Sequence, residues 1–239
     1  MTDITVEELI RRLDRLGARG HIPIDVKAGE VFGLLCTGDT GRVILVSVLT
    51  SLLIPESGFS ERSSYGILGN LGDVRRRIAI VFQDFLLDPA ISARENLDFH
   101  ARLHGIGKKA REQRIRQVLS RVGLTDAADA LVEAYTPDMK RRLEIARSLL
   151  HHPTVLLLAE PTSDLEPNSR QRIRDILKRL NRERGMTIIF TTSQVGEVEY
   201  LCDRVAVVDD GEIVALDKPE TFRAMLEKDA PPFELADGS

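Results

Sequence analysis

The sequence alternates short apolar runs with longer segments of helical periodicity, and this alternation constrains the fold more than any other feature. The runs are rich in Val, Ile and Leu, and they cover Val31–Leu35, Ile78–Phe82, Val155–Leu158 and Thr187–Thr191. Strand-sized runs separated by helices are typical of a mostly parallel sheet covered by helices. Because the runs are almost continuously apolar, we expect both faces of the sheet to be buried. The predicted fold class is therefore α/β.

An antiparallel portion is predicted near the end of the chain. The segments Arg204–Asp209 and Glu212–Leu216 flank Asp210-Gly211, a dipeptide that favours a tight type I′ turn. We therefore expect these two segments to form a β-hairpin.

Helical periodicity is clear in two segments. Apolar residues recur at i, i+3, i+4 and i+7 over Ile115–Val122 and over Ile173–Leu180. Pro167 is well placed in the first turn of the second helix, and Gly185 is well placed to end it.

An all-helical insertion is predicted between the sheet strands. No convincing strand is found between Ile91 and Leu150, and Ser92-Ala-Arg-Glu95 has the spacing of a capping box that opens a helix. We expect a single domain over residues 1–228, with a helical subdomain inserted at about residues 91–150. Residues 229–239 are expected to form a frayed tail.

Charge and cysteine content exclude several classes of protein. The 239 residues include 33 Lys and Arg against 37 Asp and Glu, and the net charge of −4 argues against a nucleic-acid partner. The basic run Lys140–Arg142 is expected to be a solvated face. Cys36 and Cys202 match no CxxC or zinc spacing, so we predict apolar filler and no metal site.

No membrane-spanning segment is predicted. The amino terminus has no apolar leader, and the longest apolar stretch, Val43–Leu53, is interrupted by Ser and Thr and is too short to cross a bilayer. We expect a cytoplasmic location, which is compatible with peripheral attachment at the inner face of the membrane.

The order of several short strings resembles that of the nucleotide-binding subunit of ATP-binding-cassette (ABC) transporters, with drug-resistance exporters as the nearest class. The strings are Ala28-Gly-Glu-Val-Phe-Gly-Leu-Leu35, Arg75-Arg-Arg-Ile78 leading into Val81-Phe-Gln83, Ala93-Arg-Glu-Asn-Leu97, Glu160-Pro-Thr-Ser163 and Cys202-Asp-Arg-Val-Ala-Val207. The resemblance extends from about Ile4 to about Leu226. It implies a P-loop NTPase-like cassette fold, with ATP and Mg²⁺ as cofactors. It also implies two partners, a membrane-embedded transporter subunit and a second cassette subunit.

In this family a Gly-rich phosphate loop follows the first strand. The loop offers backbone N–H groups and a Lys to the phosphates, and a hydroxyl to Mg²⁺. In the matching string Arg42 replaces the Lys, Cys36 replaces the first Gly, and Val43 has no oxygen for the metal. The positions that the resemblance assigns to nucleotide binding are Gly38, Thr40, Gly41 and Arg42.

The resemblance also supplies two candidate catalytic residues. Glu160 matches the general base, and Gln83 matches the Gln that senses the metal and the attacking water. A general base accelerates hydrolysis about 10²- to 10⁴-fold, but here only on a triphosphate neutralised by Mg²⁺. The acidic residue expected just before Glu160 is Ala159, which cannot hold Mg²⁺ or its water.

Four further positions depart from the family pattern. In the signature string Tyr135–Met139, Pro137 removes a backbone donor and Asp138 places a carboxylate near the phosphate, so we predict that Asp138 caps a helix instead. Ser193 replaces the switch histidine and is also predicted to be an N-cap. Leu13 replaces the aromatic residue that stacks on adenine.

Three functions are compatible with this pattern. The substitutions favour a pseudo-ATPase, a structural or docking subunit with impaired ATP and Mg²⁺ binding and little or no hydrolysis. The alternatives are an active ATPase that energises an exporter and a regulatory module that binds nucleotide without metal. The apolar segment Phe85–Leu87 either docks the membrane partner or faces the core. Because ATP contacts are lost, we expect a monomer in isolation.

Overall fold

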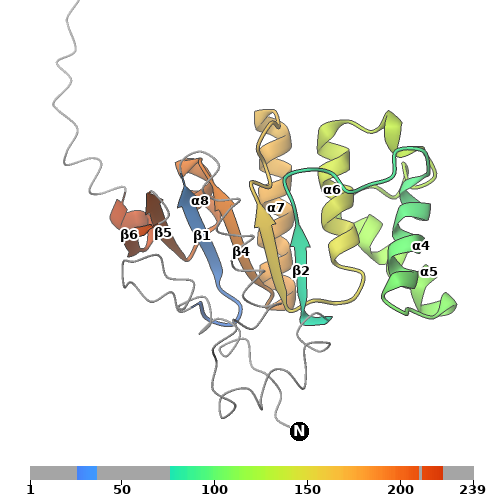
Figure 1. The fold of residues 1–239 in the computed structure, drawn as a ribbon, viewed down its shortest axis with the longest axis horizontal. Coiled ribbons are helices and arrows are strands. Elements are labelled where there is room, and N and C mark those ends of the chain that lie inside the picture. The colour runs from blue at the N-terminus through green and yellow to red at the C-terminus, as the bar shows by residue number, and fades with distance from the viewer. Residues whose placement is uncertain (1–25, 37–75, 210–211, 223–239) are drawn as a thin grey trace, which may run out of the picture.

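The computed structural model describes residues 26–36, 76–209 and 212–222. Across these ranges one six-stranded sheet runs in the order β2-β3-β4-β1-β5-β6 (Figure 1). Its strands are β1 (Val31–Cys36), β2 (Ile78–Val81), β3 (Val155–Ala159), β4 (Thr187–Thr192), β5 (Arg204–Asp209) and β6 (Glu212–Asp217).

The sheet is parallel except at one edge, which confirms the predicted fold class. Strand β1 pairs in parallel with β4 and β5, and β3 pairs in parallel with β2 and β4. Strands β5 and β6 pair antiparallel, with a register shift between Val207 and Val208, so the predicted hairpin is confirmed as a strand pair. The Asp210-Gly211 turn itself lies outside the described residues. Each predicted strand is present, and its end differs from the prediction by no more than one residue.

Two of the described helices pack against β4, in the middle of the sheet. Helix α7 (Pro167–Arg184) has Pro167 in its first turn and ends at Gly185, which adopts a left-handed conformation with φ 60°. Both predictions for this helix are therefore confirmed. The buried stripe is Ile173, Ile176, Leu177 and Leu180. Helix α8 (Val195–Leu201) is shorter and contacts β1 and β4.

A group of helices lies beyond the β2 edge of the sheet (Figure 1). It comprises α4 (Ala93–Leu103), α5 (Lys108–Arg121), the 3-10 turn η3 (Val132–Ala134) and α6 (Pro137–Ser148). The predicted capping box is confirmed, because Ser92 and Glu95 exchange hydrogen bonds at the start of α4. An isolated bridge between Ser92 and Leu131 is the one strand-like pairing described in this interval.

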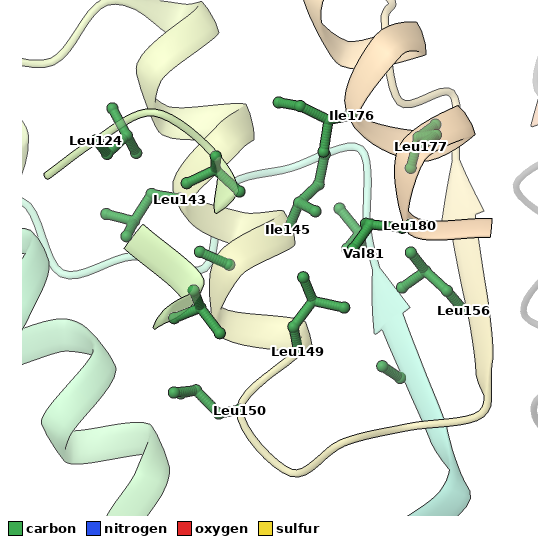
Figure 2. Close-up of a cluster of buried hydrophobic side chains, with 14 of the residues drawn as sticks. Val81, Leu124, Leu143, Ile145, Leu149, Leu150, Leu156, Ile176, Leu177 and Leu180 are labelled. Atoms are coloured by element: carbon green, nitrogen blue, oxygen red, sulfur yellow. The ribbon is translucent and has the colours of Figure 1, made fainter. Parts of the chain in front are cut away.

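The core joins these helices to the sheet. Figure 2 shows side chains of α6 and α7 meeting those of β2 and β3, among them Ile145, Leu149, Ile176, Val81 and Leu156. All five residues are at most 5% exposed. Because close-packed interiors transmit displacements, this cluster fixes the position of α6 relative to β2.

Strand β1 and the segment after α8 approach so closely that only a glycine fits between them. A Cβ atom on Gly33 would lie 2.6 Å from the Sγ atom of Cys202. Both cysteines are free thiols, Cys36 buried and Cys202 partly buried. This agrees with the prediction that they fill apolar space. Burial raises the pKa of Cys202, which keeps the thiol neutral.

We expect Gly33→Ala to lower the free energy of unfolding by about 1–3 kcal/mol, because the new methyl group overlaps the sulfur atom. Adding Cys202→Ala should recover part of this loss, a coupling that chemical denaturation of the single and double variants measures. Gly107→Ala is the control, since a Cβ there meets nothing within 4 Å. If the losses in unfolding free energy of the two single variants simply add in the double variant, the contact between Gly33 and Cys202 is contradicted.

Candidate functional site

The candidate site lies where three parallel strands end at the same edge of the sheet. Leu35 of β1 is opposite Thr192 of β4, and Ala159 of β3 is opposite Thr191 of β4. Residues that follow these strands therefore converge on one region. In open α/β sheets, ligands bind outside the carboxyl ends of the strands.

Part of the predicted site is not covered by the structure. Leu13, Gly38, Thr40, Gly41, Arg42 and Val43 lie outside the described residues.

Cys36 is the last residue of β1 and is 2% exposed. Burial raises the pKa of its thiol to about 12, and the nearby charge of Glu160 adds to the shift. The thiol is therefore protonated at neutral pH, and it lies within electrostatic range of the candidate base.

Glu160 directly follows β3 and adopts an unusual backbone conformation, with φ 43°. Its backbone N–H group faces Thr191, with the carbonyl oxygen at 3.1 Å and the Oγ1 atom at 3.2 Å. Burial raises the pKa of the carboxyl group to about 7, a hydrogen bond from the backbone of Ser193 opposes the shift, and the charges of Glu197 and Asp164 reinforce it. A carboxyl group with a pKa near neutral is suited to exchange a proton with water.

Ala159, directly before Glu160, is the position at which the family resemblance implies an acidic metal ligand. Ala159 is 2% exposed and packs in the apolar cluster on one face of the sheet, so it offers no oxygen. Within residues 26–36, 76–209 and 212–222, no group of three His, Cys, Asp or Glu side chains could hold a metal ion. Among the residues described at this edge, Glu160 supplies a carboxylate and Ala159 does not.

The prediction that Asp138 caps α6 is wrong. The N-cap is Thr136, whose hydroxyl accepts a hydrogen bond from the backbone N–H of Met139 at 3.3 Å. Pro137 occupies the first helical position, and a proline there forces the preceding residue into an extended conformation, which is that of an N-cap. The cap therefore lies two residues earlier than predicted.

Asp138 instead forms an ion pair within its own helix. Its Oδ2 atom lies 2.8 Å from Nη2 of Arg142 and 3.7 Å from Nη1 of Arg172 in α7. The same Arg142 donates to the carbonyl oxygens of Val122 and Gly123. The carboxylate at this signature position is thus already held by arginines of the same chain.

The run Lys140–Arg142 is not the solvated face that its charge predicted. Arg141 is 2% exposed, and it donates 2.5 Å hydrogen bonds to the carbonyl oxygens of Phe82 and Gln83. The arginine is buried because those two carbonyls lie beyond the end of β2 and need partners.

The prediction that Ser193 caps α8 is also wrong. The N-cap is Gln194, which makes no side-chain capping bond, while Ser193 is exposed. The Oγ1 atom of Thr192 accepts a hydrogen bond from the backbone N–H of Gln194, just before the helix, and donates one to Glu197 within it. Ser193 acts through its backbone, which bonds to Glu160.

Sequence reasoning missed three residues that shape the site. Thr191 and Thr192 end β4 and bond to Glu160 and Glu197 respectively. Glu197 is 1% exposed, and burial raises its pKa. The pair of threonines that follows the apolar run Ile188–Phe190 was the available signal, because buried hydroxyls need hydrogen-bond partners.

Of the predicted residues, the structure brings Glu160, Ala159, Cys36 and the backbone of Ser193 together at the strand ends. Gln83, Pro137 and Asp138 belong to the neighbouring region around α6, to which Gln83 is joined by Arg141. Asp164 links the two regions electrostatically, since its charge acts on both Glu160 and Arg141.

Comparison with known proteins gives consistent matches. The ABC transporter family model matches residues 20–163. The linearmycin resistance ATP-binding protein LnrL of Bacillus subtilis is 37% identical over 195 residues, which is 82% of this chain and 62% of LnrL. The daunorubicin resistance ATP-binding protein DrrA3 of Streptomyces coeruleorubidus is 34% identical over 223 residues, 93% of this chain and 70% of DrrA3. The chain thus spans less than two thirds of LnrL.

Solved structures agree on the fold. The cbiO1 protein from Clostridium perfringens, part of the ABC transporter complex cbiONQ, superposes with a TM-score of 0.73 at 27% identity, covering 87% of this chain and 84% of cbiO1. The ATP-binding cassette MJ0796, in a dimeric post-hydrolysis state bound to ADP and Pi, gives a TM-score of 0.67 at 23% identity, covering 83% of this chain and 89% of MJ0796.

Among the described helices, none combines the length and apolar character that crossing a membrane requires.

We expect Glu160→Gln to stabilise the fold at pH 8.5 relative to the wild type, and not at pH 5. The folded-state pKa of about 7 lies above the ordinary 4.5, so the wild type loses stability as the pH rises from about 4.5 through 7. The amide does not titrate, and its advantage at pH 8.5 should be about 1–3 kcal/mol after solvent screening. Thermal melting at both pH values measures it.

Glu199→Gln, which changes an exposed carboxylate on α8, is the matched control and should behave alike at both pH values. A stability difference for Glu160→Gln that does not change with pH would contradict the burial of this carboxyl group as the cause.

Proposed function

Because the chain belongs to the ABC transporter family of ATP-binding subunits, we propose that it is a cassette whose nucleotide site no longer hydrolyses ATP. In this proposal the chain is a docking or structural subunit, a pseudo-ATPase, with weakened binding of ATP and Mg²⁺. The fold is retained, and the groups that the family uses on phosphate and metal are largely replaced.

One observation carries the proposal. Ala159, at the end of β3, is buried among apolar side chains where the family supplies an acidic group for Mg²⁺. Val43 supplies no oxygen either. A triphosphate without its metal keeps the charge that opposes attack by water, and a base next to it then has little to act on.

The signature region supports the same conclusion. Pro137 has no backbone N–H to offer, and the carboxylate of Asp138 occupies the first turn of α6, paired with Arg142. In cassette dimers one site combines the phosphate loop of one subunit with the signature of the other. Both sites that this chain would share are therefore altered.

The opposing candidate is an active ATPase, and it has one specific observation in its favour. Glu160 is retained, is held by Thr191 and Ser193, and has a pKa of about 7. Such a group could serve as a general base if another residue supplied the ligand for Mg²⁺.

We place the subunit at the cytoplasmic face of a membrane, bound to a membrane-embedded partner and beside a second cassette. The relatives named for linearmycin and daunorubicin resistance favour an exporter of the drug-resistance class. Phe85 and Leu86 are 39% and 55% exposed, and they form the candidate docking surface. Leu87 packs against the core instead.

Titration with a fluorescent ATP analogue, with and without Mg²⁺, tests this proposal. We expect no micromolar, Mg²⁺-dependent binding, because the metal ligands are missing. Micromolar binding that requires Mg²⁺ and is lost in Arg42→Ala would support the active ATPase and reject the pseudo-ATPase. Metal-independent binding without phosphate release would identify a regulatory nucleotide-binding module.

Restoring the missing groups gives a complementary test. We expect the combined variant Arg42→Lys, Val43→Thr and Ala159→Asp to bind Mg-ATP about tenfold or more tightly than the wild type, about 1.4 kcal/mol. The matched control carries Ala159→Asn in place of Ala159→Asp, which keeps the shape and removes the charge. If the restored variant melts normally and binds no better than this control, Ala159 is not the metal position.

A further inference from the structure

The segment that follows β2 is held by charged side chains of α6 rather than by a neighbouring strand. Arg141 donates hydrogen bonds of 2.5 Å from Nη1 to the carbonyl oxygen of Phe82 and from Nη2 to that of Gln83. Its guanidinium also lies over the ring of Phe85, 4.8 Å from the centroid. One planar, forked cation thus contacts three residues of the segment.

Glu144 contacts the same segment one helical turn further along α6. Its Oε1 atom accepts a hydrogen bond of 2.5 Å from the backbone N–H of Leu86, and the residue is 1% exposed. Its Oε2 atom accepts from Nε of Arg147 at 2.8 Å. A buried carboxylate is tolerated when it is paired and hydrogen-bonded in this way.

The contacts continue into α4 and return to the start of β2. Arg147 contacts the ring of His100, and the ring of His104 stacks on that of His151 with 4.3 Å between centroids. The Nε2 atom of His151 lies 3.0 Å from the carbonyl oxygen of Ile78. Both ends of the segment from β2 to Leu86 are therefore fixed from the helical side.

These contacts need no ligand. Each backbone group that Arg141 and Glu144 bind is satisfied by a side chain of the same chain, in a region whose packing is set by the apolar core of α6. An unpaired buried carbonyl or N–H group would otherwise favour water, a ligand or another conformation.

We propose that Arg141 and Glu144 are positioning residues that hold Gln83–Leu86 in one conformation whether or not a nucleotide is bound. The consequence is that the exposed side chains of Phe85 and Leu86 are presented to a partner in a fixed arrangement. This consequence rests on the docking role proposed above. The positioning itself does not, and it is measurable in the isolated chain.

Residue-resolved amide hydrogen exchange on the full chain tests the proposal. We expect the Leu86 amide of the wild type to exchange slowly and to be unchanged by Mg-ATP. Glu144→Ala should accelerate this amide about tenfold or more, because its charged acceptor is lost, and leave amides in β3 and β4 unchanged. Glu144→Gln keeps one acceptor oxygen, which can serve Leu86 or Arg147 but not both, so the exchange rate of the Leu86 amide should lie between those of the wild type and Glu144→Ala. Lys140→Ala, on the same helix, is the control.

Three results would overturn the proposal: rapid exchange of Leu86 in the wild type, protection of Leu86 that appears only with Mg-ATP, or no response to Glu144→Ala. If Glu144→Ala also accelerates exchange in β3 and β4, the variant has lost the fold, and Arg141→Lys is used instead. A lysine cannot bond to both carbonyl groups, so this variant should accelerate exchange in Gln83–Leu86 alone, and no change there would overturn the proposal.

The outcomes separate this inference from the proposed function. Tight Mg-ATP binding in the titration together with nucleotide-independent protection of Leu86 would reject the pseudo-ATPase and retain the positioning role. If ATP does not bind and the exchange of the Leu86 amide does not respond to Glu144→Ala, the positioning role is rejected and the pseudo-ATPase is retained.

Discussion

Parallel pairing of β3, β4 and β1 is the constraint on which the rest of the structure depends. Because the three strands run the same way and are buried on both faces, polar residues are confined to their ends, and those ends lie side by side. Glu160, the threonines of β4 and Cys36 meet for this reason. The group of helices beyond the β2 edge is then anchored by α6 against β2 and α7.

The strands, the two long helices and the capping box of α4 were predictable from the sequence because each depends on a local pattern. A continuous apolar run buries a strand wherever it lies in the sheet, and Ser92 and Glu95 need only each other to close a capping box. Gly185 is similar, since a left-handed residue at a helix end favours glycine in almost any context.

The caps of α6 and α8 were not predictable, because neighbouring residues competed for the same role. Asp138 and Thr136 are both good caps, and Pro137 decides between them by fixing the start of the helix. At α8, the N-cap falls on Gln194, one residue after Ser193, and it is the buried Thr192 whose side chain bonds to Gln194 and Glu197. The burial of Arg141 was mispredicted, and that of Glu144 was not foreseen, for a related reason. A charged residue is expected on the surface, and the backbone groups that bury these two lie more than fifty positions away in sequence.

For the proposed function, the retention of Glu160 carries less weight than the absence of a side-chain oxygen at position 159. Its backbone is held by Thr191 and its carboxyl group by the backbone of Ser193, so the contacts that place it come from the end of β4 and persist for as long as the sheet does. Its raised pKa comes first from burial, which requires neither ATP nor metal. An acidic group at position 159 would have no comparable structural reason to exist, because a charge among the apolar residues of β3 costs stability unless a cation compensates it. A carboxyl group that the fold preserves is compatible with both an active and an inactive cassette. Under the proposed function, by contrast, an alanine at the expected metal position leaves no carboxylate to pair with the cation. The proposed function therefore rests on Ala159 rather than on Glu160.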